Sequence, residues 1–432
     1  MIFCKKAGWG MALLFLCLIF GTGRTQKIEA AVQNVPESLE EESRLDTVGT
    51  DQETERAAVR EKKGQQEKEA GDTETDQAAA AQDELLAELD FDAIQQEVDS
   101  LLSSQQFSFA GTVRSLLQDG DPFRTFRAGN AVLSCAKTAF LAQKGLMKEL
   151  FLLVLAGAVL GSFSSLFEGK QVRDASFYMV YLLALALILK NFQSSGENLK
   201  AVITSLVAFM RILTPSYYLA AAAAGGASSA VMFYQMLLLV ILAVEKLLLA
   251  LVLPMIHIYL LIALVNDLSN DLSGEEILSH MTELLETCVN GLLKSSLGVL
   301  VGMQMIRNLI APALDSLRQM ALWRTAGMIP GIGNAVNAVT ELVAGSAVLI
   351  RNCFGVTAML VLLAAGMVPA VQLLVSGLSF RLLAAAAQPV SDKRIAGCLA
   401  AAGKGYAMLL RLLLTVEVLF LLTIAILAGT FS

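Results

Sequence analysis

The sequence predicts an all-α fold: a polytopic α-helical membrane protein with about eight spans and a small exported helical N-terminal domain. Composition is the first reason, since 55% of the 432 residues are apolar and the mean hydropathy is +0.61, too high for a soluble globular protein. The second is a series of apolar runs from residue 150 onward, each about as long as a bilayer is thick. The third is that most Lys and Arg of this region lie in the short gaps between runs. These gaps alternate between basic and acidic or neutral, which orients the chain in the membrane.

Residues 1–31 are predicted to be a secretory signal peptide. Two lysines precede the apolar run 11–20, and the small residues Ala30 and Ala31 follow it. Because this run is too short for a comfortable membrane span, cleavage near the two alanines is favoured over retention as an uncleaved anchor.

Residues 32–84 are predicted to form a disordered acidic linker. Between 33 and 84 the chain has sixteen acidic and six basic residues, and no aromatic residue occurs between Phe20 and Phe91. Such a segment buries too little apolar surface to offset its conformational entropy. The rest of the chain has no basic stripe with interleaved aromatics, so we expect no nucleic-acid partner.

Residues 85–148 are predicted to form an extracytoplasmic domain of amphipathic helices. Apolar residues recur at spacings of three and four in two groups, first Phe91, Ile94, Val98 and Leu101, and then Phe109, Val113 and Leu116. A third amphipathic stretch follows at about 132–141. The helices are expected to lie outside the membrane or along its surface.

Residues 149–432 are predicted to be the transmembrane domain. The eight expected spans are 150–167, 175–189, 201–224, 230–265, 292–310, 332–350, 353–375 and 408–427. The fourth run is long enough to cross twice, turning at Glu245 and Lys246, or once as a helix that is tilted or broken near Pro254. A single crossing puts the later basic gaps inside and the acidic stretch 267–286 outside. It is therefore favoured by the positive-inside rule, and it places both chain ends outside.

The sixth run, 332–350, is polar for a span and follows Pro330, so it either spans the membrane or re-enters it. Gly327, Gly331 and Gly333 are candidates for shaping this packed or re-entrant element. Pairs of glycines four residues apart predict close packing of helices within the bundle rather than a dimer face. These pairs are Gly157 with Gly161, Gly298 with Gly302, and Gly327 with Gly331.

Ionisable residues interrupt several of the apolar runs. They are Arg211, Glu245, Lys246, Glu341, Arg411 and Glu417. Each costs about 2.5–3.5 kcal/mol at the middle of a bilayer, so each is expected to face the interior of the bundle or a partner. They are candidates for a polar conduit or for structural pairing. Structural pairing is favoured because their signs are mixed.

No catalytic, cofactor-binding or metal site is expected, and the chain is predicted not to be an enzyme. The stretch 397–405 has one residue too many for a P-loop, carries Gly where Ser or Thr is needed, and follows no strand. The two histidines, His257 and His280, stand far apart, and the cysteines form no CxxC pair.

The stretch 329–356, IPGIGNAVNAVTELVAGSAVLIRNCFGV, resembles the signature of the stage III sporulation protein AE family. Shorter motifs that support the resemblance are LTPSY at 213–217, GGASSA at 225–230, LP at 253–254 and LVN at 264–266. The resemblance covers about residues 85–432, and the long acidic linker departs from it.

The resemblance implies a role that the residues alone do not give. Members of this family belong to an envelope-spanning complex of endospore-forming Firmicutes, in the mother-cell membrane that engulfs the forespore. The implied partners are other stage III sporulation membrane subunits, forespore membrane proteins, a separate secretion-type ATPase and the lipid bilayer. The resemblance thus favours a non-enzymatic subunit of a secretion-like channel needed for late forespore development. The alternative is a stand-alone permease or secondary transporter, which would show repeated halves with matching broken helices.

Overall fold

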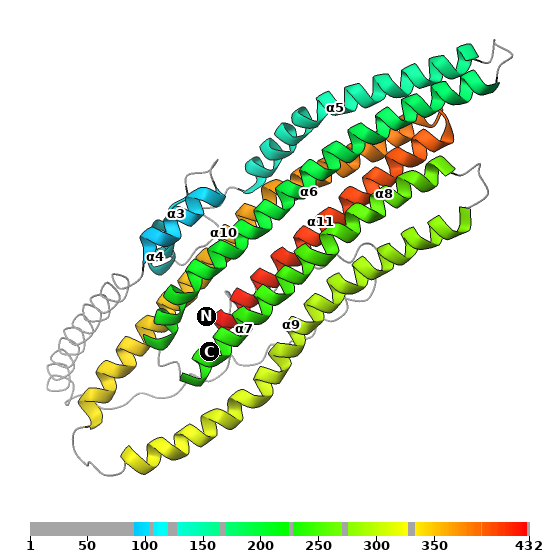
Figure 1. Ribbon diagram of the computed structural model, residues 1–432. Coiled ribbons are helices and arrows are strands. Elements are labelled where there is room, and N and C mark those ends of the chain that lie inside the picture. Colours follow the sequence, from blue (N-terminus) through cyan, green and yellow to red (C-terminus); the bar gives the residue numbers. More distant parts are fainter. Residues whose placement is uncertain are drawn as a thin grey trace, which may run out of the picture.

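The computed structural model describes residues 90–102, 107–119, 128–164, 170–223, 228–269, 275–326, 333–389 and 391–429. Within these ranges the chain forms helices and short turns with no strand, which confirms the predicted all-α class. In chain order the helices are α3 (Phe91–Leu101), α4 (Phe109–Asp119), α5 (Ala128–Ser164), α6 (Lys170–Ala223), α7 (Ser228–Leu247), the π-helical turn η2 (Leu248–Val252), α8 (Leu253–Ser269), α9 (Glu275–Ala326), α10 (Gly333–Ala387) and α11 (Lys393–Gly429). From α5 onward they form long rods that run in alternating directions along one bundle (Figure 1).

Three of these rods are much longer than a bilayer is thick. The helices α6, α9 and α10 have 54, 52 and 55 residues. A rise of about 1.5 Å per residue makes each of them roughly 80 Å long, whereas a hydrocarbon core is about 30 Å thick. Each rod therefore extends well beyond the hydrocarbon core.

Five stretches of the described helices are long and apolar enough to cross a membrane. They are Tyr178–Tyr217, Leu238–Leu268, Leu278–Met303, Gly345–Ala387 and Lys393–Ile426. Because these stretches lie on five separate rods, the chain is a multi-pass α-helical membrane protein, as the composition predicts.

The predicted count of eight spans is not confirmed, because two pairs of expected spans are single helices. The runs 175–189 and 201–224 both belong to α6, and the runs 332–350 and 353–375 both belong to α10. The polar segment that joins the first pair contains no proline, so the backbone hydrogen bonds of the helix continue through it. A continuous helix crosses a bilayer only once.

The fourth apolar run forms one continuous rod, and the alternative of two spans turning at Glu245 and Lys246 is wrong. The rod consists of α7, η2 and α8, and its irregularity is the π-helical turn just before Pro254. In this turn the Leu253 N–H donates to the Leu248 carbonyl, five residues back. Since Pro254 has no N–H to complete the usual α-helical bond, a local change of helical period lets the rod continue without a break.

The two short helices α3 and α4 bury the faces that their periodicity predicts. Ile94, Val98, Phe109 and Val113 are all completely buried. These helices pack against α6 and α10, where the Phe109 and Phe354 rings meet edge to face with centroids 5.0 Å apart. The short helices therefore share the hydrophobic core of the rods.

Helix α11 lies at the centre of the bundle and packs against α6, α8, α9 and α10 (Figure 1). Glycines permit its closest approaches. A Cβ built on Gly403 would lie 2.8 Å from Cγ of Arg381 and 3.2 Å from the backbone oxygen of Gly377, both on α10. A Cβ on Gly405 would lie 3.0 Å from the ring of Phe192 on α6. In lipid, where helices gain little from the hydrophobic effect, such close backbone contact is a main source of helix association.

Of the glycine pairs predicted to pack within the bundle, the structure confirms the role of Gly157. A Cβ on Gly157 would lie 3.0 Å from Val180 of the neighbouring helix α6. The same prediction is wrong for Gly298 and Gly302, since a Cβ on either glycine would meet none of the described residues within 4 Å. Both lie on α9, which packs on the bundle with other residues.

We expect Gly403→Ala to destabilise the bundle by about 1–3 kcal/mol, because the added methyl group overpacks the α10–α11 contact. Gly345→Ala is the matched control, since a Cβ there meets nothing within 4 Å. It should be neutral or stabilising by up to about 1 kcal/mol through helix propensity. Thermal unfolding followed by circular dichroism in detergent measures both. Equal unfolding temperatures for the two variants would contradict the packing role of Gly403.

Candidate functional site

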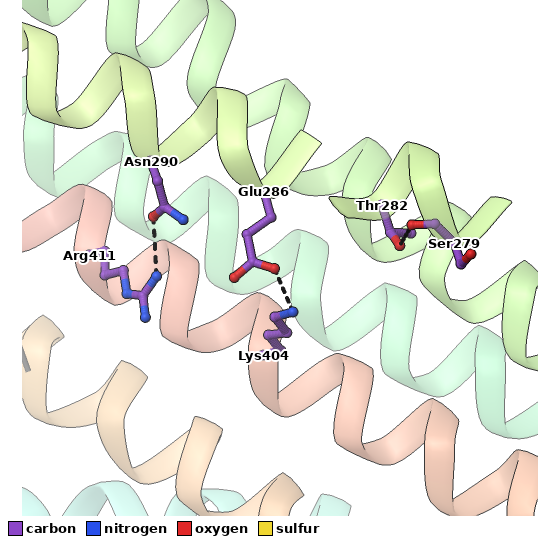
Figure 2. A network of polar contacts seen from close by, with 6 residues as sticks. All are labelled: Ser279, Thr282, Glu286, Asn290, Lys404 and Arg411. Carbon is purple, nitrogen blue, oxygen red and sulfur yellow. Dashed lines mark hydrogen bonds and ion pairs between the residues drawn. The ribbon is translucent and has the colours of Figure 1, made fainter. Parts of the chain in front are cut away.

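A ladder of polar side chains joins α9 to α11 (Figure 2). Lys404 Nζ lies 2.5 Å from Oε2 of Glu286, and Nη1 of Arg411 donates to Oδ1 of Asn290 over 3.1 Å. Glu286 and Asn290 are one turn apart on α9, while Lys404 and Arg411 are two turns apart on α11. This spacing puts each pair on one face of its helix, so the two contacts fix the register of α9 on α11.

The cations of this ladder remain accessible at the surface of the bundle. The side chain of Lys404 is 48% exposed and that of Glu286 is 26% exposed, and Arg411 is exposed as well. Lys404 also lies 5.9 Å from the ring centroid of Tyr259 on α8, which adds a cation–π contact. Both cations belong to an apolar stretch that is long enough to span a membrane. An exposed charge in such a stretch requires water, a lipid headgroup or another protein beside it.

A second polar cluster lies inside the bundle and is hydrogen-bonded. The hydroxyl of the fully buried Tyr406 accepts a bond of 2.6 Å from the Asn191 amide and lies 3.2 Å from the Ser195 hydroxyl, both on α6. Nearby on α8, Nδ1 of His257 lies 2.8 Å from the Leu253 carbonyl, and its ring fills the space left by Gly196. The polar segment of α6 is thus paired within the bundle, which explains why it continues as helix.

Glu417, a predicted site residue, lies in the tightest part of the α10–α11 contact. Its side chain is 2% exposed, and neither carboxyl oxygen has a hydrogen-bond partner among the described residues. A Cβ built on Gly366 of α10 would lie 2.6 Å from the carboxyl carbon of Glu417, so the missing side chain of Gly366 provides the space for this group. An unpaired buried carboxyl group costs free energy, so packing alone does not account for it.

The other predicted ionisable residues of α6 and α7 lie together. Glu245 is buried at 7% exposure, and it is attracted electrostatically by Arg211 of α6 and by its neighbour Lys246, both of which are exposed. These three residues therefore place a buried acid near two exposed cations.

The remaining predicted residues belong to the segment that carries the family signature. Gly327, Pro330 and Gly331 lie outside the described residues. Gly333 is the first residue of α10 and Glu341 lies in its third turn, and the placement of their side chains is likewise outside the described part of the structure. The structure therefore does not test whether these residues shape a re-entrant element.

The ladder corrects the predicted sidedness of two segments. The eight-span topology puts the acidic stretch 267–286 and Lys404 on opposite sides of the membrane, but Glu286 and Lys404 form an ion pair. Asp267 likewise packs against Gly397, where a Cβ would lie 3.0 Å from its carboxyl group. Because α10 is one helix rather than two, the end of α8 and the start of α9 lie at the same end of the bundle as the end of α10 and the start of α11.

Sequence reasoning missed the ladder as a unit. The sequence signal for the ladder is the spacing of its polar residues. Glu286 and Asn290 are four positions apart on α9, and Lys404 and Arg411 are seven positions apart on α11, so each pair lies on one face of its helix. That spacing does not reveal which helices are neighbours. Within the described residues, no group of three or more His, Cys, Asp and Glu side chains is placed to hold a metal ion.

The fold and these polar contacts define a class, a multi-pass α-helical membrane protein with charged groups inside its spans. The sequence model of a family described as Stage III sporulation protein AE matches residues 107–430. This chain belongs to that family, as the signature at 329–356 predicts. A curated relative, "Stage III sporulation protein AE" of Bacillus subtilis (strain 168), is 22% identical over 295 residues, which are 68% of this chain and 73% of the relative. No solved structure matches the chain.

We expect Glu417→Leu to raise the stability of the purified protein while impairing its function. Removing a buried carboxyl group that lacks a hydrogen bond should stabilise the bundle by about 1–3 kcal/mol. Glu197→Leu is the control, because Glu197 is exposed on α6 and its substitution should change stability by no more than about 0.5 kcal/mol. Thermal unfolding in detergent and heat-resistant spore counts measure the two effects. Normal spore formation by Glu417→Leu would show that Glu417 has no functional role.

Proposed function

We propose that this chain is a non-enzymatic membrane subunit of a sporulation-specific transport complex that links the mother cell and the forespore. The observation that carries the proposal is membership of the stage III sporulation protein AE family across most of a multi-pass helical bundle. The sequence adds that the stretch 397–405 does not meet the requirements of a P-loop. Energy from nucleotide hydrolysis would therefore come from a separate secretion-type ATPase subunit.

The proposed location is the mother-cell membrane around the forespore, and the proposed partners are other stage III membrane subunits and forespore membrane proteins. The proposed topology has six crossings, made by α5, α6, the α7–α8 rod, α9, α10 and α11. An N-terminal part outside the cytoplasm would then put the α5–α6, α8–α9 and α10–α11 connections inside. The basic residues near two of these connections support this orientation, namely Lys170 and Arg173 at α5–α6 and Lys393 and Arg394 at α10–α11.

The alternative, a stand-alone permease, receives no support from the geometry. Such transporters bind their substrate between repeated halves that contain matching interrupted helices. The described residues contain one interruption inside a long rod, the π-helical turn Leu248–Val252, and show no counterpart of it in the other half of the chain.

We expect deletion of the gene to stop spore formation after engulfment and to leave vegetative growth unchanged. The reason is that a subunit of a sporulation complex is needed only once the forespore is enclosed. Counts of heat-resistant spores, microscopy of engulfment and growth curves on defined media measure the effect, and the intact gene returned in trans is the control. A defect in vegetative uptake of a nutrient would favour the permease instead.

We expect cysteines at positions 391 and 279 to be labelled from the same side of the membrane, because the α10–α11 and α8–α9 connections lie at one end of the bundle. The variants Ser391→Cys and Ser279→Cys are made in a chain whose own cysteines are replaced by alanine. A membrane-impermeant maleimide should reach both only after permeabilisation, whereas Ser228→Cys, at the start of α7, should react in intact cells.

Two other results are informative. Labelling of position 279 but not 391 in intact cells would restore the eight-span topology. Labelling of both positions in intact cells would confirm that they lie on the same side of the membrane, but it would reverse the proposed orientation of the chain.

A further inference from the structure

Among the described residues, helix α9 presents a face without a packing partner, and the middle of this face is composed of polar and small residues. Thr287, Gly291, Lys294 and Gly298 follow one another at spacings of three and four, so they lie along one side of the helix, and all are exposed. A Cβ built on Gly291 or Gly298 would meet nothing within 4 Å. We call these four residues, with Gly302 one turn further on, the α9 face.

The middle of this face differs from the exposed surface that lipid normally covers, while toward its two ends the same side of α9 carries the exposed apolar residues Leu284, Val301 and Met305. Buried residues make up 22% of the apolar window in α9 and 61% of that in α11, so α9 is the least enclosed of the five spans. A lipid-facing surface of a span usually carries long apolar side chains, whereas small residues on a span allow a second helix to approach closely. The small residues in the middle of the α9 face therefore allow close contact with another helix.

The charges beside the face define the chemistry of its occupant. Arg411 of α11 is exposed next to it, and its hydrogen-bond partner in the described part of the chain is the neutral Asn290. Lys294 adds a second exposed cation about one turn from Asn290. Glu286 is already paired with Lys404, and the exposed Glu283 lies one turn before the face, near the start of α9. The middle of the face therefore has an excess of positive charge.

A second copy of the chain does not match this charge. Two copies related by an axis along the membrane normal would bring Lys294 near Lys294 and Arg411 near Arg411, which repel. An exposed acid of α6, Glu197, lies between Lys190 and Lys200, which are also exposed, so that surface is positive as well. The complementary occupant is a helix of a different protein.

We propose that the α9 face docks a transmembrane helix of another protein, with an Asp or Glu carboxylate of that helix bound to Arg411 and Lys294. Small residues of the partner helix would pack on Gly291 and Gly298. This inference rests on the proposed function as a subunit of a membrane complex, and it names the surface and the chemistry by which one partner is held. A carboxylate there would neutralise an exposed guanidinium group within an apolar span.

The test is photocrosslinking of the full-length chain in sporulating cells. A photoreactive phenylalanine analogue replaces Thr287 or Val301, which lie on either side of Gly291 and Lys294. The matched control places it at Leu182, a 54% exposed residue of α6. The crosslinked peptide is identified by mass spectrometry. The expected adduct from α9 is a membrane helix that contains an Asp or Glu, and no such adduct forms from position 182.

Charge reversal then tests the chemistry. Arg411→Glu should lower the crosslink yield by about tenfold or more, the loss expected for a charged hydrogen bond, and Asp or Glu to Lys in the partner should restore it. If Arg411→Glu does not accumulate in the membrane, the same measurement is made with Arg411→Gln after its abundance in the membrane has been checked.

The inference is overturned by adducts with lipid only, with a second copy of this chain or with a helix that lacks a carboxylate. It is equally overturned by no adduct, as in a water-filled passage, or by a yield unchanged in both Arg411 variants. The deletion phenotype is read separately, so docking without a sporulation defect would overturn only the proposed function.

Discussion

The close contact of α11 with its neighbours is the constraint on which the rest of the structure depends. Gly403 and Gly405 let its backbone approach α10 and α6 closely. A methyl group added at Gly403 would overlap Arg381, and one added at Gly405 would crowd Phe192. In a bilayer this contact replaces the hydrophobic effect as the force that holds helices together. Once α11 is fixed, the register of the rods around it follows. The hydrogen bonds of Tyr406 hold α6, and the Glu286–Lys404 ion pair holds α9.

The same contact gives two ionisable residues of the α11 apolar stretch, Arg411 and Glu417, opposite surroundings. Arg411 and Glu417 are six residues apart, a rotation of about 240° in an α-helix, so they face different sides. Glu417 is enclosed against Gly366, and Arg411 is exposed beside α9. Both are unfavourable in an apolar setting. Glu417 is buried without a hydrogen bond from any described residue, and the charge of Arg411 reaches the surface of a span. Features that lower stability in this way are expected where a protein binds or moves something.

Much of the fold could be predicted from local sequence, because helix class and membrane insertion depend on composition and on periodicity over about 20 residues. The buried faces of α3 and α4 follow from spacing alone. Charge bias also favours the single crossing of the fourth run, but it does so by placing the acidic stretch 267–286 and Lys404 on opposite sides of the membrane, which their ion pair contradicts. The number of spans could not be predicted in this way. The polar segment of α6 is as typical of a turn as of a helix, and its pairing with Tyr406 and His257 depends on residues far along the chain. Treating it as a turn reverses the predicted direction of the crossings by the α7–α8 rod and α9, until the second error, in α10, restores the direction for α11.

The sequence by itself determined that this protein is an all-helical membrane protein with the signature of one sporulation family, since apolar length and a local motif are properties of contiguous residues. Only the tertiary structure decided which ionisable residues are buried, which form pairs and which reach the surface. Glu417 and Arg411 have similar local sequence, and the ion pair of Glu286 with Lys404 joins residues that charge bias alone would separate across the membrane. Such contacts depend on the register between helices. That register is set by close packing at a few glycines, which periodicity within one helix does not specify.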